Sequence, residues 1–218
     1  MTQDDQKKAA AEAALEYVDY GEVIGVGTGS TANYFIDALS RIKNRLDGVV
    51  ASSEVSKQRA LRQGIPVLEL NAVTGLALYV DGADEATHNR HLIKGGGGAL
   101  VREKIVAASS DKFVCIVDGT KMSDVLGSFP LPIEVIPMAR SLVSRRIVGF
   151  GGVPEFREGF ITDNGNQILD IKRLELTDPI RLETEINSIP GVVDNGIFAV
   201  RGADTIIIGE TSGVKYIE

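Results

Sequence analysis

The first 127 residues alternate between short apolar runs and segments in which apolar residues recur at helical spacing. The run at 76–80 is apolar throughout, which is typical of a strand in a sheet covered on both faces. The predicted strands lie at 22–26, 49–52, 66–68, 76–80 and 113–117. The predicted helices lie at 4–19, 33–45, 55–63 and from 99 onward. This alternation predicts an α/β domain with an open, mostly parallel sheet.

The pattern changes after residue 127, where Phe129-Pro-Leu-Pro132 indicates a hinge. The following order is that of a split βαβ, ferredoxin-like sandwich with one additional strand. Its elements are predicted as strand 131–136, helix 138–148, strand 153–157, strands 160–162 and 167–171, helix 178–188 and a strand near 196–200. Asp163-Asn-Gly165 predicts a hairpin turn between 160–162 and 167–171. The apolar run at 204–209 is predicted to return to the first sheet, so that residues 1–127 plus 203–218 form one domain and 128–202 an inserted α+β domain.

Composition narrows the class of protein. The chain has 218 residues, and its 23 basic and 30 acidic residues give a net charge of −7, which argues against a nucleic-acid partner. No apolar run approaches the ~20 residues of a membrane span, and residues 1–8 lack the apolar core of a signal peptide. The single cysteine, Cys115, falls in a predicted buried strand, where a packed thiol is expected rather than a nucleophile. We therefore expect a cytoplasmic protein with no membrane partner.

A glycine- and hydroxyl-rich turn, Gly25-Val-Gly-Thr-Gly-Ser-Thr31, connects the strand at 22–26 to the next helix. Backbone N–H groups and hydroxyls at a helix N-terminus can bind a phosphate. The turn lacks the Gly-Lys-[Ser/Thr] ending of a Walker loop and does not continue as a dinucleotide fingerprint. It favours a small phosphorylated ligand held by Thr28, Ser30 and Thr31, with a tight turn that binds nothing as the alternative.

A second glycine-rich segment consists of Lys94 and four glycines, 95–98, which lead into a helix carrying Glu103. Glycine is costly to order, so four in a row indicate backbone that lies against a ligand or takes positive φ. The positive end of the helix dipole at the glycines suits an anion or a developing oxyanion. The alternative is a flexible linker, although linkers usually mix glycine with serine.

Carboxylates crowd the end of the strand at 76–80, in Asp81-Gly-Ala-Asp-Glu85. A divalent metal is one interpretation, with His88 and His91 nearby, but His-x-x-His in a polar loop favours surface histidines. The segments 25–31, 81–85 and 118–121 all follow strands, whose carboxyl ends share one edge of a parallel sheet, so we expect them to converge. Phosphate-binding groups, acids, lysines and a helical Glu103 together favour proton transfer next to a carbonyl of a sugar phosphate.

Four segments together resemble the ribose-5-phosphate isomerase family of the A type, and the similarity spans essentially the whole chain. They are Gly25-Val-Gly-Thr-Gly-Ser-Thr-Ala32, Asp81-Gly-Ala-Asp-Glu85, Lys94-Gly-Gly-Gly-Gly-Ala-Leu-Val-Arg-Glu-Lys104 and Asp118-Gly-Thr-Lys121. The resemblance implies interconversion of ribose 5-phosphate and ribulose 5-phosphate without metal or organic cofactor, in the non-oxidative pentose phosphate pathway. It also implies a Rossmann-like domain with a small lid or oligomerisation domain, and a homodimer or homotetramer.

The resemblance further implies roles for single residues. Glu103 matches the base that moves a proton between C1 and C2, and Asp81, Asp84 and Lys94 match groups that assist ring opening and hold the reacting oxygens. The residues expected to bind substrate are Lys7, Thr28, Gly29, Ser30, Thr31, Asp81, Gly82, Ala83, Asp84, Lys94, Gly95, Gly96, Gly97 and Lys121. Val101 stands where many family members have threonine, which affects fine tuning rather than the reaction.

Two other functions are compatible with parts of this pattern. Another sugar-phosphate isomerase or transferase would keep the phosphate loop but not the pairing of residues 81–84 with 94–104. A non-catalytic sugar-phosphate sensor could dispense with Glu103 and would normally carry a DNA-reading module, for which this acidic chain shows no helix-turn-helix extension. A structural scaffold would leave the clustered acids and glycines without a purpose. The isomerase is the favoured prediction.

Overall fold

The computed structural model describes residues 1–218, which divide into two compact units. Unit 1 comprises Met1–Ala83, Arg102–Lys121 and Ala203–Glu218, and unit 2 comprises Asp84–Val101 and Met122–Gly202. The sequence analysis placed 84–101 and 122–127 in the first domain. The structure assigns them to unit 2. There β5 (Leu92–Ile93) pairs with β4 (Glu85–Ala86) on one side and with β11 (Ile197–Phe198) on the other, in a small sheet separate from the large one.

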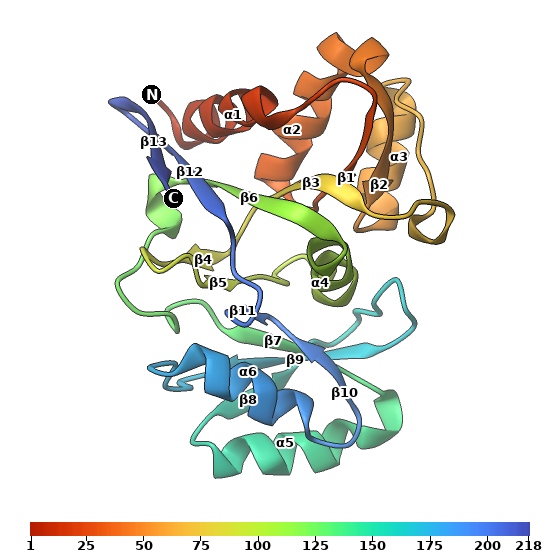
Figure 1. The fold of residues 1–218 in the computed structure, drawn as a ribbon. Helices are drawn as coiled ribbons and strands as arrows, with labels where there is room; N and C mark the ends of the chain where they lie inside the picture. Colours follow the sequence, from red (N-terminus) through yellow and green to blue (C-terminus); the bar gives the residue numbers. More distant parts are fainter. The chain divides into compact units, whose positions relative to one another are not determined.

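Unit 1 is built on a six-stranded sheet with the order β13-β12-β6-β3-β1-β2 (Figure 1). All of its strand pairs are parallel except that of β12 with β13. The strands are β1 (Glu22–Val26), β2 (Leu46–Ala51), β3 (Leu76–Asp81), β6 (Ser110–Asp118), β12 (Thr205–Glu210) and β13 (Gly213–Ile217). The chain leaves β1 for β2 on one side and later returns to β3 on the other. The order therefore reverses between β1 and β3, where open α/β sheets bind their ligands.

Three helices cover one face of this sheet, and α4 lies against the other (Figure 1). They are α1 (Gln3–Ala13), α2 (Ser30–Leu39) and α3 (Glu54–Arg62) on the first face, and α4 (Leu100–Ala108) on the second. Ala10, Phe35 and Ile36 form a buried core with Ile24 and Val80 of the strands. The expected return of 204–209 to the sheet is confirmed by the pairing of β12 with β6, whereas β13 was not expected.

Unit 2 contains a four-stranded antiparallel sheet with the order β10-β7-β9-β8. Its elements are β7 (Leu131–Val135), α5 (Arg140–Gly149), β8 (Val153–Phe156), β9 (Gln167–Lys172), α6 (Pro179–Asn187) and β10 (Val192–Asn195). This is the βαββαβ order expected for a ferredoxin-like sandwich. Val143 and Ile147 of α5 and Ile186 of α6 pack with strand residues such as Ile133 and Leu169 in the core of this unit.

Several element boundaries differ from the sequence expectation. The predicted strand at 160–162 is wrong, because β9 pairs with β8 and Thr162 lies in the connection between them. The turn at 163–165 does form, but it closes on Thr162, whose hydroxyl donates to the buried Glu134 of β7 at 3.1 Å. The expected strand at 66–68 is only a single bridge between Val67 and Val49. None of the helices is long and apolar enough to span a membrane.

Candidate active site

The end of β3 places the carboxylate of Asp81 in a set of hydrogen bonds at the point where the strand order reverses. Its Oδ1 accepts the backbone N–H of Thr28 at 3.0 Å and that of Gly82 at 2.7 Å. Its Oδ2 accepts the hydroxyl of Tyr79, and Asp81 is fully buried. Three donors from β3 and the loop after β1 therefore hold both oxygens, so that the carboxylate has one orientation.

Gly27 allows this close approach of the two loops. A Cβ at position 27 would lie 1.8 Å from Oδ1 of Asp81 and 1.9 Å from its Cγ, distances that no pair of non-bonded atoms adopts. The sequence had shown a glycine-rich turn here. Its steric reason is the Asp81 side chain, which comes from a segment more than fifty residues later.

The hydroxyl of Thr28 belongs to a group of hydroxyls that sequence reasoning missed. Thr28 Oγ1 lies 2.9 Å from Ser52 Oγ and donates to Ser53 Oγ at 2.8 Å. Ser56 Oγ donates to the carbonyl of Gly27 at 2.6 Å, and Ser53 caps α3 by accepting the Ser56 N–H at 3.1 Å. A Ser-Ser pair at the end of β2, three residues before Ser56, was the available sequence signal. These bonds fix Thr28 at the start of the glycine loop.

The N-terminus of α2 follows directly at Ser30. Its N-cap residue, Gly29, has a positive φ of 113° and gives the helix no side-chain cap. The N–H groups of the first helical turn are therefore open to an external acceptor, with Ser30 exposed and Thr31 buried beside them. Open N–H groups, two hydroxyls and the positive end of the helix dipole are suited to a phosphate.

Glu103 lies on α4 with only 3% of its surface exposed, and its charge acts on Tyr79. Complete burial raises the pKa of the Tyr79 phenol well above its usual value of 10.0, and the nearby charges of Asp81 and Glu103 raise it further. The phenol therefore keeps its proton and remains a hydrogen-bond donor to Asp81. Tyr79 was read from the sequence only as part of an apolar strand.

The loop after β6 carries Asp118 and Lys121. Asp118 is fully buried and accepts the N–H of Thr120 at 3.0 Å and the amide of Gln3, on α1, at 3.3 Å. Lys121 is half-buried in the following short helical turn. Lys7 lies on α1, 13% exposed, with its Nζ 3.7 Å from Asp4 Oδ1. Asp118 thus links the loop of Lys121 to the first turn of α1.

Unit 2 holds the remaining predicted residues. The N–H of Asp84 donates to the carbonyl of Ile93 at 2.9 Å, and its Oδ2 accepts the N–H of Gly96 at 2.7 Å. Lys94 is 2% exposed, its N–H donates to the Gly196 carbonyl at 2.9 Å, and its Nζ lies 5.7 Å from the centre of the Phe198 ring. A lysine side chain over the face of an aromatic ring makes a cation–π contact.

The predicted site residues thus form two groups that the structure builds separately. Lys7, Thr28, Gly29, Ser30, Thr31, Asp81, Gly82, Ala83, Glu103 and Lys121 belong to unit 1, and Asp84, Lys94, Gly95, Gly96 and Gly97 to unit 2. The histidines considered as metal ligands lie in the β4–β5 turn, where the N–H of Thr87 donates to the carbonyl of His91 at 3.0 Å. No group of three or more His, Cys, Asp or Glu side chains is arranged to hold a metal ion.

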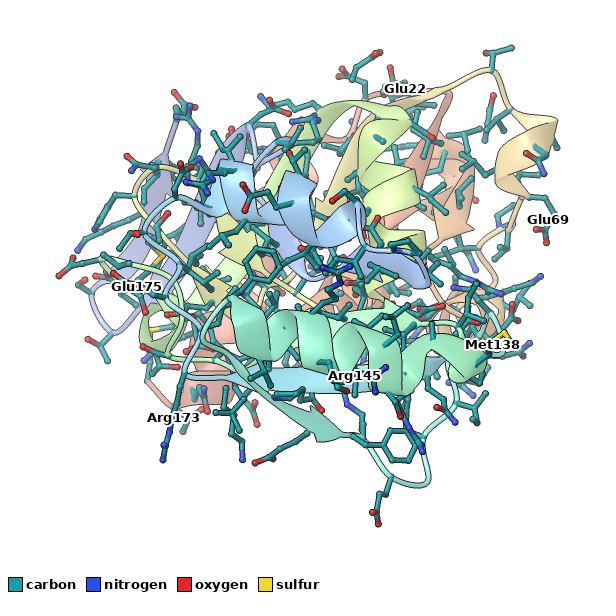
Figure 2. All side chains as sticks on the ribbon, turned by 90° about the horizontal axis from the view of Figure 1, so that it is seen from below. Glu22, Glu69, Met138, Arg145, Arg173 and Glu175 are labelled. Atoms are coloured by element: carbon teal, nitrogen blue, oxygen red, sulfur yellow. The ribbon has the colours of Figure 1, made fainter.

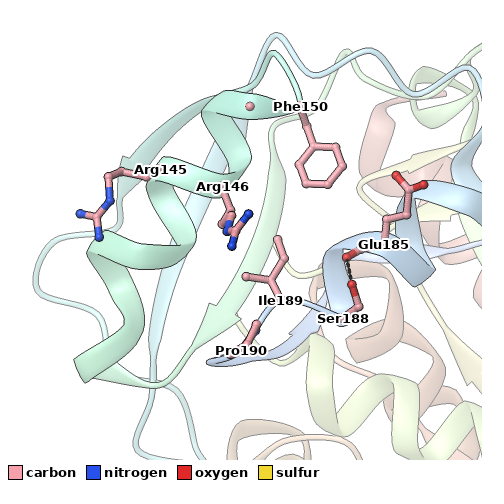
Figure 3. Close-up of a pocket in the computed structure, with 8 residues that line it drawn as sticks. Arg145, Arg146, Phe150, Glu185, Ser188, Ile189 and Pro190 are labelled. Carbon is pink, nitrogen blue, oxygen red and sulfur yellow. Dashed lines mark hydrogen bonds between the residues drawn. The ribbon is translucent and has the colours of Figure 1, made fainter.

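A separate hollow of about 610 Å³ lies between α5 and α6 (Figure 3). It is lined by Arg145, Arg146, Gly149, Phe150, Glu185, Ser188, Ile189 and Pro190. None of the predicted site residues lines it. The predicted site residues on the loops at 27–31, 81–84, 94–97 and 118–121, and Glu103, thus lie outside this hollow.

Comparison with known proteins connects these loops to one family. A family model described as ribose 5-phosphate isomerase A (phosphoriboisomerase A) matches residues 48–213. The crystal structure of ribose 5 phosphate isomerase A from Neisseria gonorrhoeae is 51% identical, covers 99% of this chain and 97% of its own, and has a TM-score of 0.97. A D-ribose-5-phosphate isomerase in complex with phospho-erythronic acid is 41% identical, and the Methanocaldococcus jannaschii ribose 5-phosphate isomerase A is 40% identical. Each of these two covers 100% of both chains with a TM-score of 0.95.

Proposed function

Because the chain belongs to the ribose 5-phosphate isomerase A family, whose members are isomerases, we propose that it interconverts D-ribose 5-phosphate and D-ribulose 5-phosphate by metal-free proton transfer through an enediolate. The proposal is supported by two buried side chains, each described within its own unit: the helical carboxylate of Glu103 in unit 1 and the side chain of Lys94 in unit 2. A base and a cation are what an aldose–ketose proton shift requires.

The reaction begins from the open-chain aldose. Asp81, Asp84 and Lys94 assist ring opening and hold the oxygens on C1 and C2. Glu103 takes the proton from C2, the C1 carbonyl oxygen receives the electron pair, and an enediolate forms. The proton of the C2 hydroxyl passes to the C1 oxygen, Glu103 returns its proton to C1, and the C2 carbonyl of ribulose 5-phosphate is complete. Atoms and charge balance without a metal, a cofactor or an external oxidant.

Burial supports this assignment of Glu103. With only 3% of its surface exposed, Glu103 is largely shielded from water, which would otherwise compete for the proton. Lys94 and the N–H groups of Gly95 and Gly97 would stabilise the enediolate oxygens, while the N–H of Gly96 holds Asp84. One such oriented donor typically contributes about 3 kcal/mol to a transition state.

The phosphate would bind at the N-terminus of α2. The N–H groups and hydroxyls of Ser30 and Thr31 supply donors, and Thr28 is fixed beside them by Ser52 and Ser53. Lys7 and Lys121 would add positive charge. The relative that was solved with phospho-erythronic acid holds a phosphorylated sugar acid, whose planar carboxylate resembles the two oxygens of an enediolate.

The cellular setting is part of the same proposal. The reaction would serve the non-oxidative pentose phosphate pathway in the cytoplasm, because its substrate and product are both pentose phosphates. The Rossmann-like domain would carry the base. The small domain would either act as a lid or form the contacts of a homodimer or homotetramer.

The test is exchange of the C2 proton of ribose 5-phosphate in D₂O with EDTA present. The wild type should exchange the proton and form ribulose 5-phosphate. Glu103→Gln should lose activity by roughly 100- to 10,000-fold while still binding substrate. Glu69→Gln is the matched control, because that carboxylate is 77% exposed in the same unit (Figure 2).

Each contrary outcome removes a definite part of the proposal. Substrate binding without exchange in the wild type would favour the sensor function. Activity that EDTA abolishes and a divalent ion restores would exclude the metal-free mechanism. Full activity in Glu103→Gln would remove Glu103 from the role of base.

A further inference from the structure

The glycine loop at 95–98 is held from its outer side by an arginine that the site motifs do not contain. Arg157 Nη1 donates to the carbonyl of Gly95 at 3.3 Å and to that of Gly96 at 3.2 Å. We propose that Arg157, oriented by Asp170, is a positioning residue that fixes the peptide planes of this loop, so that the Gly96 N–H holds Asp84 and the Gly97 N–H is directed toward the substrate. The inference rests on the proposed function of the loop.

Arg157 is itself rigidly placed. Its backbone N–H continues the pairing of β8 with β9 by donating to the Ile168 carbonyl at 3.0 Å. Its Nε and Nη2 donate to the two oxygens of Asp170, on β9, at 2.8 and 2.5 Å. This bidentate pair is 18% and 24% exposed. A guanidinium fixed by its planar fork leaves Nη1 aimed at one place, the glycine loop.

The geometry of the peptide bond transfers this orientation to the donors. The C=O and N–H of a trans peptide point in opposite directions, and the chain has no cis peptide bond. Holding the Gly95 carbonyl therefore directs the Gly96 N–H to the opposite side, where it meets Asp84 Oδ2 at 2.7 Å. Holding the Gly96 carbonyl directs the Gly97 N–H in the same way. Gly97 is exposed, and its N–H has no hydrogen-bond partner in the protein.

Phe160 closes the loop from the same side. Its ring lies 5.4 Å from Arg157 Cζ, and a Cβ on Gly98 would lie 2.2 Å from the ring. Gly98 also has a φ of +81°, a conformation that other residues rarely adopt. The loop is thus packed against the connection between β8 and β9, and Arg157 is the residue of that connection that reaches its carbonyls.

If Arg157 served only to stabilise the fold, its removal would lower the activity only as far as it lowers the stability. Gly96 is exposed, so water can satisfy its carbonyl if Arg157 is removed, and the unit should still fold. What water cannot replace is the fixed direction of the peptide planes. Misplacement of a catalytic group by about 1 Å can cost about 100-fold in rate.

The experiment compares Arg157→Ala, Arg157→Lys and Asp170→Asn with Lys172→Ala as control. Lys172 forms an ion pair of 2.7 Å with Glu155 across the same two strands, and about half of each side chain is exposed. We expect the first three variants to lose about 10- to 100-fold in kcat, with a smaller change in KM and an unchanged circular dichroism spectrum. Added methylguanidinium should restore part of the activity of Arg157→Ala, and it should restore no activity in the other variants.

The outcomes separate this inference from the proposed function. A wild type without isomerase activity would refute the proposed function. An active wild type with Arg157→Ala no slower than Lys172→Ala would refute the positioning role alone. Activity that falls only in step with the unfolding temperature, without rescue by methylguanidinium, would also refute it. Asp170→Asn keeps the side-chain volume, so it supplies the kinetic result if Arg157→Ala fails to fold.

Discussion

Glu85 gives the sharpest test of how the structure is held together, because one carboxylate serves three consecutive backbone N–H groups. Its Oε2 accepts those of Gly127 at 2.9 Å and Phe129 at 3.1 Å, and its Oε1 accepts that of Ser128 at 3.2 Å. In Glu85→Gln, the amide oxygen of glutamine can take the place of Oε2 and keep two of the bonds. The amide NH₂ group then faces the N–H of Ser128, and two donors cannot bond to each other. Losing one charge-assisted bond and weakening two should destabilise the fold by about 2 to 3 kcal/mol.

The pH dependence of this loss has a defined sign. Burial raises the pKa of Glu85, but the N–H groups of Gly127 and Phe129 outweigh it, so that the pKa lies below its usual value. The unfolded chain therefore binds the proton more readily than the folded one. The stabilisation by Glu85 is complete above the unfolded pKa of ~4.3 and disappears as the pH falls through the folded pKa. The difference in free energy of unfolding between wild type and Glu85→Gln should be constant near neutral pH and should shrink in acid.

The assay is thermal unfolding followed by far-UV circular dichroism between neutral and acidic pH. For a chain of this size, 2 kcal/mol corresponds to a fall in Tm of about 4 to 8 °C. Glu175→Gln is the control, since Glu175 is exposed, without a hydrogen-bond partner, and among the outward-pointing side chains of Figure 2. Equal Tm values for the two variants, or a difference that persists unchanged in acid, would refute the reasoning.

Two further predictions concern the Asp81 carboxylate. Gly27→Ala places a methyl group 1.8 Å from Asp81 Oδ1, so we expect a loss of about 1 to 3 kcal/mol in stability and a fall in kcat; wild-type Tm and kcat would contradict the packing argument. Tyr79→Phe removes the donor to Oδ2 and should cost about 1.5 to 3 kcal/mol. Because burial and the charges of Asp81 and Glu103 raise the Tyr79 pKa well above 10.0, the activity ratio of wild type to variant should stay constant up to about pH 10. A change in the wild-type rate with pH below about pH 10 that is absent in Tyr79→Phe would contradict this prediction.

Local patterns in the sequence were enough to predict the elements and their class. The apolar run at 76–80, the glycine-rich turn after β1 and the helix after residue 98 depend on interactions between residues a few positions apart. The βαββαβ order of the second half was likewise predicted from apolar residues that recur at strand spacing in some segments and at helical spacing in others, and the structure confirms this order. The expected strand at 160–162 failed because the buried carboxylate of Glu134 accepts hydrogen bonds from Thr162 and Asn166, which hold this segment as a loop. No local pattern records such a partner.

Tertiary contacts, and not local sequence, also place residues 84–101 in unit 2. The two-residue strands β4 and β5 are too short for a periodic signal, and their third partner, β11, follows more than a hundred residues later. The sequence also gave no sign that Tyr79 donates to Asp81, because a tyrosine in an apolar strand is expected to be core. Only the packing of β1 against β3 brings the Thr28 N–H to Asp81 across 53 positions.

Sequence by itself thus determined which residue types are available for the chemistry and on which kind of element each of them lies. The tertiary structure decided the hydrogen bonds that orient them: Asp81 by Tyr79 and Thr28, and the glycine loop by Arg157 across about sixty positions. The physical reason is the range of the forces involved. Helix, strand and turn preferences act over a few residues. The partner of a buried polar group is selected by whichever donor the packed core places within hydrogen-bond distance.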